Sequence, residues 1–175
     1  PEAGMYATKY NLVDKNGEQK EISVKGLPSK NKNYIGIIPN YFKSAAVGDL
    51  PVWSSAVCIP KRIFTSNNIW FPVGEKYGED QHVWARVAMK YEVAYNTKTC
   101  ALYMLETENN TYLKNSKEKE PQESILGLRK FRESIKEEEK KKYFDKYIQR
   151  YISSQVLSNM KNGNNVLNKT ILSEN

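Results

Sequence analysis

Alternating and short apolar runs along the first 105 residues predict a sheet with a few short helices. The predicted strands are residues 5–13, 19–24, 53–59, 91–95 and 99–105, and residues 35–38 are a short apolar piece. The first two form a hairpin, because Asp14-Lys15-Asn16-Gly17 between them is a strong turn sequence. Short helices are predicted over 40–47 and 61–66, and an irregular loop rich in aromatic residues follows at 67–77.

The helix predicted over residues 80–90 carries a carboxylate in an unusual place. At about 100° per residue, its apolar side chains gather on one face, and Asp80 falls near the middle of that face. This face holds Val83, Trp84, Val87, Ala88 and Tyr91, whereas His82, Ala85, Arg86 and Met89 lie opposite. Because an isolated buried charge is costly, Asp80 is either a helix cap, a common role for Asp before an apolar run, or a functional carboxylate.

A second, helical part is predicted after a polar linker. Residues 106–121 are polar and rich in lysine, whereas 122–160 have apolar positions at three- to four-residue spacing, which predicts two helices. A short final helix is predicted near 165–172. The clearest apolar stripe comprises Tyr143, Phe144, Tyr147, Ile148, Tyr151 and Ile152. Such a stripe is typical of a packing surface, which docks on the first part of the chain or on another chain.

Composition narrows the function classes. The chain has 175 residues, enough for a domain with a real core, and a moderately basic net charge of +7. Lysines and glutamates alternate near the C-terminus and no recognition motif is present, so nucleic-acid binding ranks low. One histidine and two distant cysteines, Cys58 and Cys100, give no zinc pattern. No apolar run approaches the roughly 20 residues of a transmembrane helix.

The order of motifs resembles the second half of the nucleotide-binding GT-A domain in family 2 glycosyltransferases. The resemblance rests on Trp53-Ser54-Ser55-Ala56-Val57-Cys58-Ile59-Pro60-Lys61-Arg62-Ile63-Phe64, the aromatic loop, Gly78-Glu79-Asp80 with Trp84 and Arg86, and Tyr91-Glu92-Val93-Ala94-Tyr95. It covers about residues 5–105, and its most specific part is 78–86. It implies an α/β fold, α+β within this fragment, with a mixed sheet followed by a helical extension. The implied domains are 1–105, a linker at 106–121, and the extension at 122–175.

The resemblance also implies a reaction and its residues. Family members transfer a sugar from a nucleotide-diphosphate sugar to an acceptor hydroxyl with inversion, as hexosyltransferases do. Asp80 matches the catalytic base, a role that contributes roughly 10²–10⁴-fold to the rate. The implied acceptor contacts are Glu79, Trp53, Ser54, Trp70 and Phe71, and the implied structural supports are Trp84 and Arg86, the latter as an ion-pair partner. For Trp70 and Phe71, filling the core is the simpler alternative.

One part of the family pattern is missing from the sequence. Family members hold Mn²⁺ or Mg²⁺ with an Asp-x-Asp motif. The aspartates of this chain, which are Asp14, Asp49, Asp80 and Asp145, are nowhere spaced in that way. We therefore expect the acceptor-side half of an enzyme, inactive alone, with no metal ligand of its own. A half-domain also predicts an exposed sheet edge and apolar surface, which favour a homodimer.

Two functions follow as expectations. The first is a bacterial, cytoplasmic transferase of polysaccharide biosynthesis, peripheral to the inner membrane face, with a nucleotide-sugar donor and a glycan acceptor. The second is a non-catalytic interaction module, in which Asp80 is only a cap and the tyrosine-rich C-terminal helices bind a partner. Changing Asp80 separates them, because loss of a cap costs about 1 kcal/mol of stability, whereas a base can be removed with little loss of fold.

Overall fold

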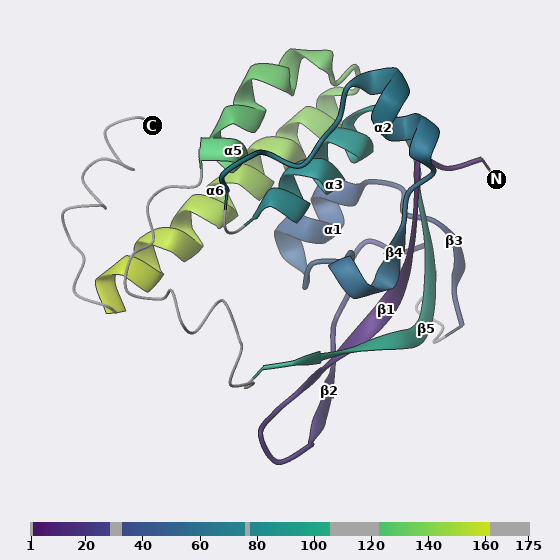
Figure 1. Cartoon of the computed structure of the whole chain (residues 1–175), viewed down its shortest axis with the longest axis vertical. Helices are drawn as coiled ribbons and strands as arrows, with labels where there is room; N and C mark the ends of the chain where they lie inside the picture. Colours follow the sequence, from purple (N-terminus) through teal and green to yellow (C-terminus); the bar gives the residue numbers. More distant parts are fainter. Residues whose placement is uncertain (1, 29–32, 76–77, 106–122, 162–175) are drawn as a thin grey trace.

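A curled sheet packed against helices makes up the fold of this chain (Figure 1). The computed structural model describes residues 2–28, 33–75, 78–105 and 123–161. Within these ranges the fold is α+β, with a mixed sheet of five strands in the order β2-β1-β5-β3 and with β4 paired to β1 beside this path. The expected mixed sheet with a helical C-terminal part is confirmed. The predicted linker and the predicted final helix lie outside the described residues.

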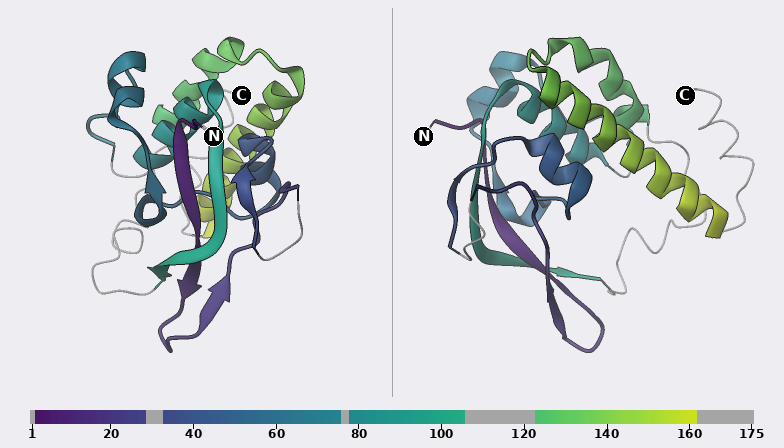
Figure 2. Two further views of the ribbon diagram at one scale, coloured as in Figure 1. Left: turned by 90° about the vertical axis from the view of Figure 1, so that its right-hand side faces the viewer. Right: turned by 180° about the vertical axis from the view of Figure 1, so that it is seen from behind.

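Two long parallel strands form the centre of the sheet. The strands are β1 (Met5–Val13), β2 (Gln19–Glu21), β3 (Ile35–Ile37), β4 (Val57–Cys58) and β5 (Val93–Met104). β1 and β5 pair in parallel along their length, and the remaining pairs are antiparallel. The hairpin of β1 and β2 extends beyond the helices, as Figure 2 shows from two further sides.

The turn of this hairpin follows from its sequence. Asp14 Oδ1 accepts hydrogen bonds from the backbone N–H groups of Asn16 and Glu18, both at 2.9 Å. Gly17 adopts a φ of 81°, a conformation that glycine reaches without steric cost. The predicted hairpin is therefore confirmed, together with its cause.

A bulge in β5 lies opposite Lys9 of β1. Thr8 pairs with Asn96, Lys9 with Thr99 and Tyr10 with Ala101, so the extra residues belong to β5. In β1 the side chains alternate: Ala7 is buried in the main core, whereas Tyr10 on the other face is buried in a second, smaller cluster that also includes Trp53 and Tyr103. An irregularity of this kind bends a strand and increases its twist, which accounts for the curl of the sheet.

Two strand predictions need correction. The segments 91–95 and 99–105 were expected as separate strands, but β5 is continuous from Val93 to Met104, because its ladder with β1 resumes at Thr99 after the bulge. Residues 53–59 were expected as a buried strand. They form a 3-10 turn, η1 (Ser54–Ala56), followed by the two residues of β4, and Cys58 is exposed. The apolar residues of this segment therefore belong to a turn that packs on the sheet, with Ala56 buried in the second cluster.

Short helices and the helices of the C-terminal part pack around a common core. They are α1 (Tyr41–Val47), α2 (Lys61–Asn67), α3 (Glu79–Lys90), α5 (Glu123–Leu126), the 3-10 helix η2 (Gly127–Ser134) and α6 (Glu138–Lys161). The short helices α1 and α2 confirm the sequence prediction. Asn40 caps α1, since its Oδ1 accepts a hydrogen bond from the N–H of Lys43 at 3.0 Å.

The predicted stripe of α6 packs within this chain. Phe144, Tyr147 and Ile152 are buried in the main core, and Phe144 meets Phe42 of α1 edge-to-face at 5.2 Å between ring centroids. Arg150 of α6 donates hydrogen bonds to the carbonyls of Ala45 and Gly48, at the end of α1 where carbonyls lack helical partners. One continuous core therefore joins both parts of the chain. None of the described helices is long and apolar enough to cross a membrane.

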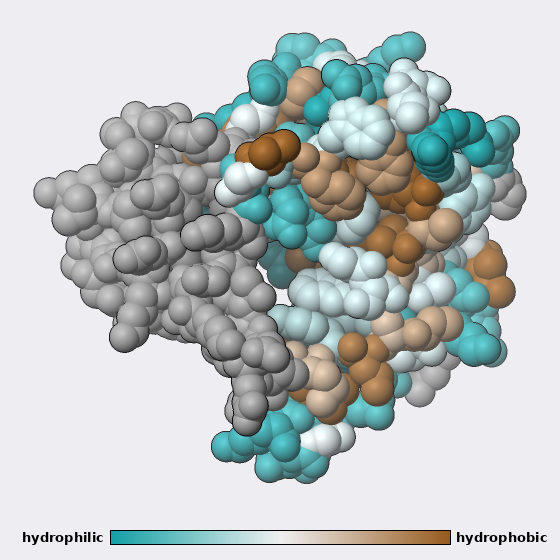
Figure 3. All heavy atoms as spheres, viewed as in Figure 1, coloured by the Kyte–Doolittle hydropathy of each residue, from teal (hydrophilic) through white to brown (hydrophobic). Residues whose placement is uncertain are grey.

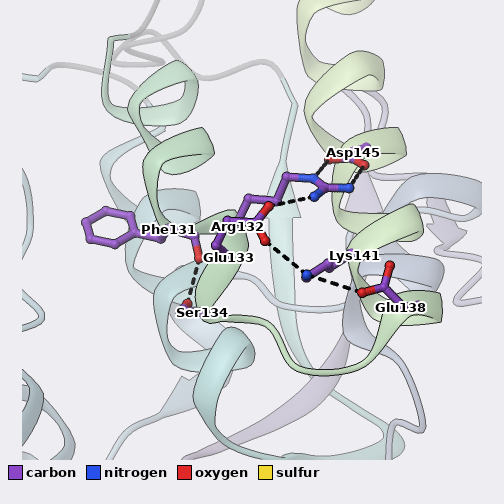
Figure 4. A network of polar contacts seen from close by, with 7 residues as sticks. All are labelled: Phe131, Arg132, Glu133, Ser134, Glu138, Lys141 and Asp145. Atoms are coloured by element: carbon purple, nitrogen blue, oxygen red, sulfur yellow. Dashed lines mark hydrogen bonds and ion pairs between the residues drawn. The ribbon is translucent and has the colours of Figure 1, made fainter.

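A polar network on the surface ties η2 to α6 (Figure 4). Arg132 donates two hydrogen bonds to the carboxylate of Asp145, each at 2.8 Å, and Lys141 donates to Glu133 and lies 3.2 Å from Glu138. Exposed pairs contribute little stability singly. The bidentate pair adds a defined geometry, so this network supplements the buried contacts of α6.

Candidate functional site

The fold places Asp80 in the first turn of α3, the helix that leads into β5. α3 ends at Lys90, just before β5 begins at Val93. A helix of 12 residues is about 18 Å long, so the first turn lies away from the start of β5. There it meets η1, the turn before β4.

Asp80 is not the N-cap residue of its helix. Gly78 takes that position with a φ of 72°, makes no side-chain cap, and is followed by Glu79 and Asp80 in the first turn. Asp80 Oδ1 instead accepts a hydrogen bond from the N–H of Gln81 at 2.6 Å. The carboxylate is thus stabilised by the positive end of the helix, but the cap interpretation in its simple form does not hold.

The second oxygen of Asp80 is held by a residue from another element. Ser54 Oγ, in η1, donates a hydrogen bond to Asp80 Oδ2 at 2.6 Å. A carboxylate offers about four acceptor positions, so two hydrogen bonds orient it and leave room for a third donor. Asp80 is partly exposed and Ser54 is exposed. A hydroxyl group of a ligand can therefore reach a carboxylate whose orientation is already fixed.

Two buried tyrosines share the electrostatic environment of Asp80. Burial raises the pKa of Tyr41, and its neighbours Tyr147 and Asp80 raise it further; burial and the charge of Asp80 also raise the pKa of Tyr147. Among the described residues, neither hydroxyl has a hydrogen-bond partner, and neither does Gln81 Oε1 or Trp84 Nε1. Buried polar atoms are nearly always hydrogen-bonded. Of these atoms, the hydroxyls of Tyr41 and Tyr147 belong to residues whose pKa the charge of Asp80 raises.

Tyr41 and Tyr147 were not recognised as site residues from the sequence. Tyr147 belongs to the stripe of α6, and this position in the stripe indicated packing only, which it also provides. Tyr41 follows the cap of α1 with no motif around it. Only the tertiary contacts of α1 and α6 bring the two residues toward α3.

α3 is buried on more sides than its helical projection predicts. Ala85 and Met89, expected opposite the apolar face, are both buried, because α5 and η2 pack against α3. The guanidinium of Arg86 lies 3.9 Å from the ring centroid of Phe131 in η2, and burial lowers its pKa. Within the described part of the chain it forms no ion pair. The expected ion pair is thus replaced by a cation–π contact.

The aromatic loop lies against the helix that carries Asp80. Trp70 and Phe71 each pack on Phe64 of α2, at 5.9 and 6.1 Å between ring centroids. Phe71 also meets Trp84 edge-to-face at 6.1 Å, and Trp84 lies one helical turn after Asp80. Trp70 is 54% and Phe71 46% exposed. Because both rings rest on the core and still face solvent, neither acts only as a core residue.

The two remaining acceptor contacts expected from the sequence, Trp53 and Glu79, do not contact Asp80 through a hydrogen bond. Trp53 packs on Tyr103 and Tyr10, at 4.3 and 5.4 Å between ring centroids. Glu79 is partly exposed, and its carboxylate has no hydrogen bond or ion pair with another residue that the structure describes. Of the acceptor contacts expected from the sequence, Ser54 is the one hydrogen-bonded to Asp80.

The Mn²⁺ or Mg²⁺ implied by the resemblance does not fit the residues in place. These cations need several oxygen ligands arranged around one point. Across residues 2–28, 33–75, 78–105 and 123–161, no group of three or more His, Cys, Asp or Glu side chains could hold a metal ion. We therefore assign no metal ligand in this part of the chain.

Comparison with family models, with curated proteins and with solved structures found no match.

Proposed function

We propose that this chain is the acceptor side of an inverting glycosyltransferase, with Asp80 as its general base. The observation that carries the proposal is the hydrogen bond from Ser54 to Asp80. A carboxylate that only caps a helix needs no partner from a distant element. One that must receive a proton from a bound hydroxyl gains from a fixed orientation and a free, accessible acceptor position.

The proposed reaction uses the groups of the site as follows. The acceptor hydroxyl donates a hydrogen bond to Asp80, and its oxygen attacks the anomeric carbon of the nucleotide-sugar. The proton passes to the Asp80 carboxylate, while the bond from the anomeric carbon to the diphosphate oxygen breaks and the nucleoside diphosphate leaves with the electron pair. Ser54 keeps the carboxylate in line, and the half-exposed rings of Trp70 and Phe71 offer flat surfaces to the apolar faces of the acceptor sugar.

Donor binding is assigned to none of the 175 residues. The sequence has no Asp-x-Asp spacing, so we propose that the chain does not transfer sugar by itself. We further propose that residues 1–105 are the acceptor-side half of a GT-A domain. The parallel pair of β1 and β5, with Asp80 on the helix that leads into β5, supports this assignment.

We also propose a bacterial, cytoplasmic setting at the inner face of the membrane, in polysaccharide biosynthesis. The net charge of +7 suits an anionic surface. Trp70, Phe71 and the fully exposed Val73 form an apolar tip that follows Lys61 and Arg62 of α2 in the chain.

The homodimer stays a prediction. On the face shown in Figure 3, apolar residues form small groups separated by hydrophilic ones. The interaction-module alternative stays a prediction too, but it loses its proposed binding face, because the stripe of α6 is buried against α1.

A transfer assay tests the proposal. The complete open reading frame that encodes this chain is expressed and incubated with Mn²⁺, a panel of UDP- and GDP-sugars and a panel of saccharide acceptors, and products are identified by mass spectrometry. We expect an acceptor enlarged by one sugar of inverted configuration. A protein that is folded and binds a nucleotide-sugar, yet gives no enlarged acceptor with any pair, contradicts the proposal.

A further inference from the structure

A cavity of about 600 Å³ lies in the hollow of the curled sheet. Strands β1, β2, β3 and β5 contribute to its walls, and the segment 22–27 closes one side. Its volume is in the range of small-molecule sites. None of the residues that line it belongs to the site around Asp80, so it is a second candidate site.

Three charged side chains line this cavity. Lys9 Nζ lies 2.5 Å from Glu21 Oε2, and the Lys9 side chain is only 15% exposed. The third charge is Lys98, whose ammonium group has no hydrogen bond or ion pair with any other described residue. The two lysines and the glutamate sum to one positive charge. The cavity therefore favours a ligand with a single negative charge.

Neutral polar groups lie beside these charges. Asn96 Oδ1 accepts a hydrogen bond from the backbone N–H of Lys98 at 2.8 Å, which leaves its amide N–H groups for a ligand. Thr99 Oγ1 donates to Asn11 Oδ1 at 3.3 Å and keeps its acceptor positions. Ser23 and Asn33 also line the cavity. The lining thus offers both donors and acceptors.

Aliphatic residues also line the cavity. Leu27 and Ile35 are among them, and Ile35, which pairs with Asn96 in the sheet, is 76% exposed. A ligand that lies on Ile35 removes this apolar surface from water, which is favourable. A fitting ligand therefore presents both C–H groups and hydrogen-bonding groups.

We propose that this cavity binds a short saccharide that carries one carboxylate, paired with Lys98. A sugar ring has hydroxyl groups around its edge and C–H groups on its faces, which matches a lining of both polar groups and the aliphatic residues Leu27 and Ile35. A wholly apolar ligand would leave the polar groups unpaired, at a cost in affinity, and a dianionic phosphate would meet the carboxylate of Glu21. This inference rests on the proposed function, because it makes the cavity a place where an acidic acceptor chain binds away from Asp80.

The experiment is an NMR titration of the ¹⁵N-labelled chain with cellobiouronic acid, a disaccharide with one carboxylate, and with neutral cellobiose as the matched ligand. We expect cellobiouronic acid to shift the amide signals of residues 22–27 and 96–99, and to bind at least about tenfold more tightly than cellobiose. Lys98→Gln should weaken this binding about tenfold, whereas Lys20→Gln, a lysine of β2 outside the cavity, should not.

Three results would overturn the inference. These are shifts absent from the cavity residues, equal binding by Lys98→Gln, and the same shifts produced by inorganic phosphate at the same concentration. Asp80→Asn should still bind cellobiouronic acid. Binding without any sugar transfer would contradict only the proposed function, and transfer without binding in the cavity would contradict only this inference.

Discussion

Ser54 Oγ and Asp80 Oδ2 lie 2.6 Å apart and join the turn before β4 to the first turn of α3. Among the described residues, Ser54 is the only one whose side chain forms a hydrogen bond with the carboxylate of Asp80. The remaining oxygen of the carboxylate is satisfied locally, by the N–H of Gln81. The orientation of the carboxylate therefore depends on Ser54.

Removing this hydroxyl should lower activity more than stability. Ser54→Ala should reduce transfer about tenfold, equivalent to about 1.4 kcal/mol in the transition state, because the carboxylate is then free to rotate. Ser55→Ala is the matched control, since Ser55 is also exposed and follows directly in the same turn. Steady-state kinetics and thermal melts of both variants check this. An equal loss in the two variants would show that Ser54 has no special role.

The entry into α3 depends on a left-handed residue. Gly78 has φ 72° and ψ 2°, and a side chain there costs about 1–2 kcal/mol. Gly78→Ala should therefore lower the free energy of unfolding by about that amount in urea denaturation. Gly127→Ala is the control, because it has no positive φ and a Cβ added there meets nothing within 4 Å. A Gly78→Ala variant as stable as Gly127→Ala would contradict the assigned geometry.

Buried tyrosines should make the fold sensitive to alkali. Burial raises the pKa of Tyr41, Tyr95 and Tyr147, and raises that of Tyr10 to about 12. Above about pH 10 the unfolded chain loses these protons while the folded chain keeps them, so the stability is complete below pH 10 and falls as the pH rises. Each such tyrosine adds a slope of about 1.4 kcal/mol per pH unit.

Urea denaturation at several alkaline pH values measures this slope. Tyr147→Phe should make it shallower, because one raised pKa is removed. Tyr143→Phe, a half-buried tyrosine of the same helix, controls for the substitution itself. A slope in the Tyr147→Phe variant that equals that of the unmodified chain would show that Tyr147 ionises while the protein remains folded.

The surface network of η2 and α6 should give a salt-dependent stability (Figure 4). Arg132→Gln should lower the melting temperature, and the difference should shrink in about 1 M NaCl because exposed charges are screened. Hydrogen bonds from Lys141 and Arg132 also lower the pKa of Glu133. The stability that Glu133 contributes is therefore present above the pKa it has in the unfolded chain, and it is lost as the pH falls through the pKa it has in the folded protein. Lys142→Gln, an exposed lysine of the same helix, is the control. A difference unaffected by salt would contradict an electrostatic role.

Local signals were enough to predict the short-range elements. The hairpin turn is fixed by Asp14 and Gly17, and α1 begins after the cap Asn40, all within a few positions of the structure they produce. The general α+β character, with a helical C-terminal part, follows from the same patterns. These features need no knowledge of distant contacts.

The features that the sequence did not predict depend on contacts between segments far apart in the chain. β5 is one strand because its ladder with β1 resumes at Thr99, beyond a bulge in the polar residues that separated the two predicted strands. Ala85 and Met89 are buried because η2 covers a second side of α3. Of the candidate site, Asp80 and Ser54 were named from the family resemblance and stay predictions, whereas Tyr41 and Tyr147 are brought near Asp80 by tertiary structure alone.

The central claim is that Asp80 removes the proton of an acceptor hydroxyl, and Asp80→Asn tests it most directly. The amide keeps the shape of the side chain but cannot take up that proton. We predict that kcat/KM for transfer by the complete open reading frame falls roughly 10²–10⁴-fold, with a melting temperature close to that of the unmodified protein. Transfer that persists at near the original rate, or a loss of activity fully explained by unfolding, would contradict the account.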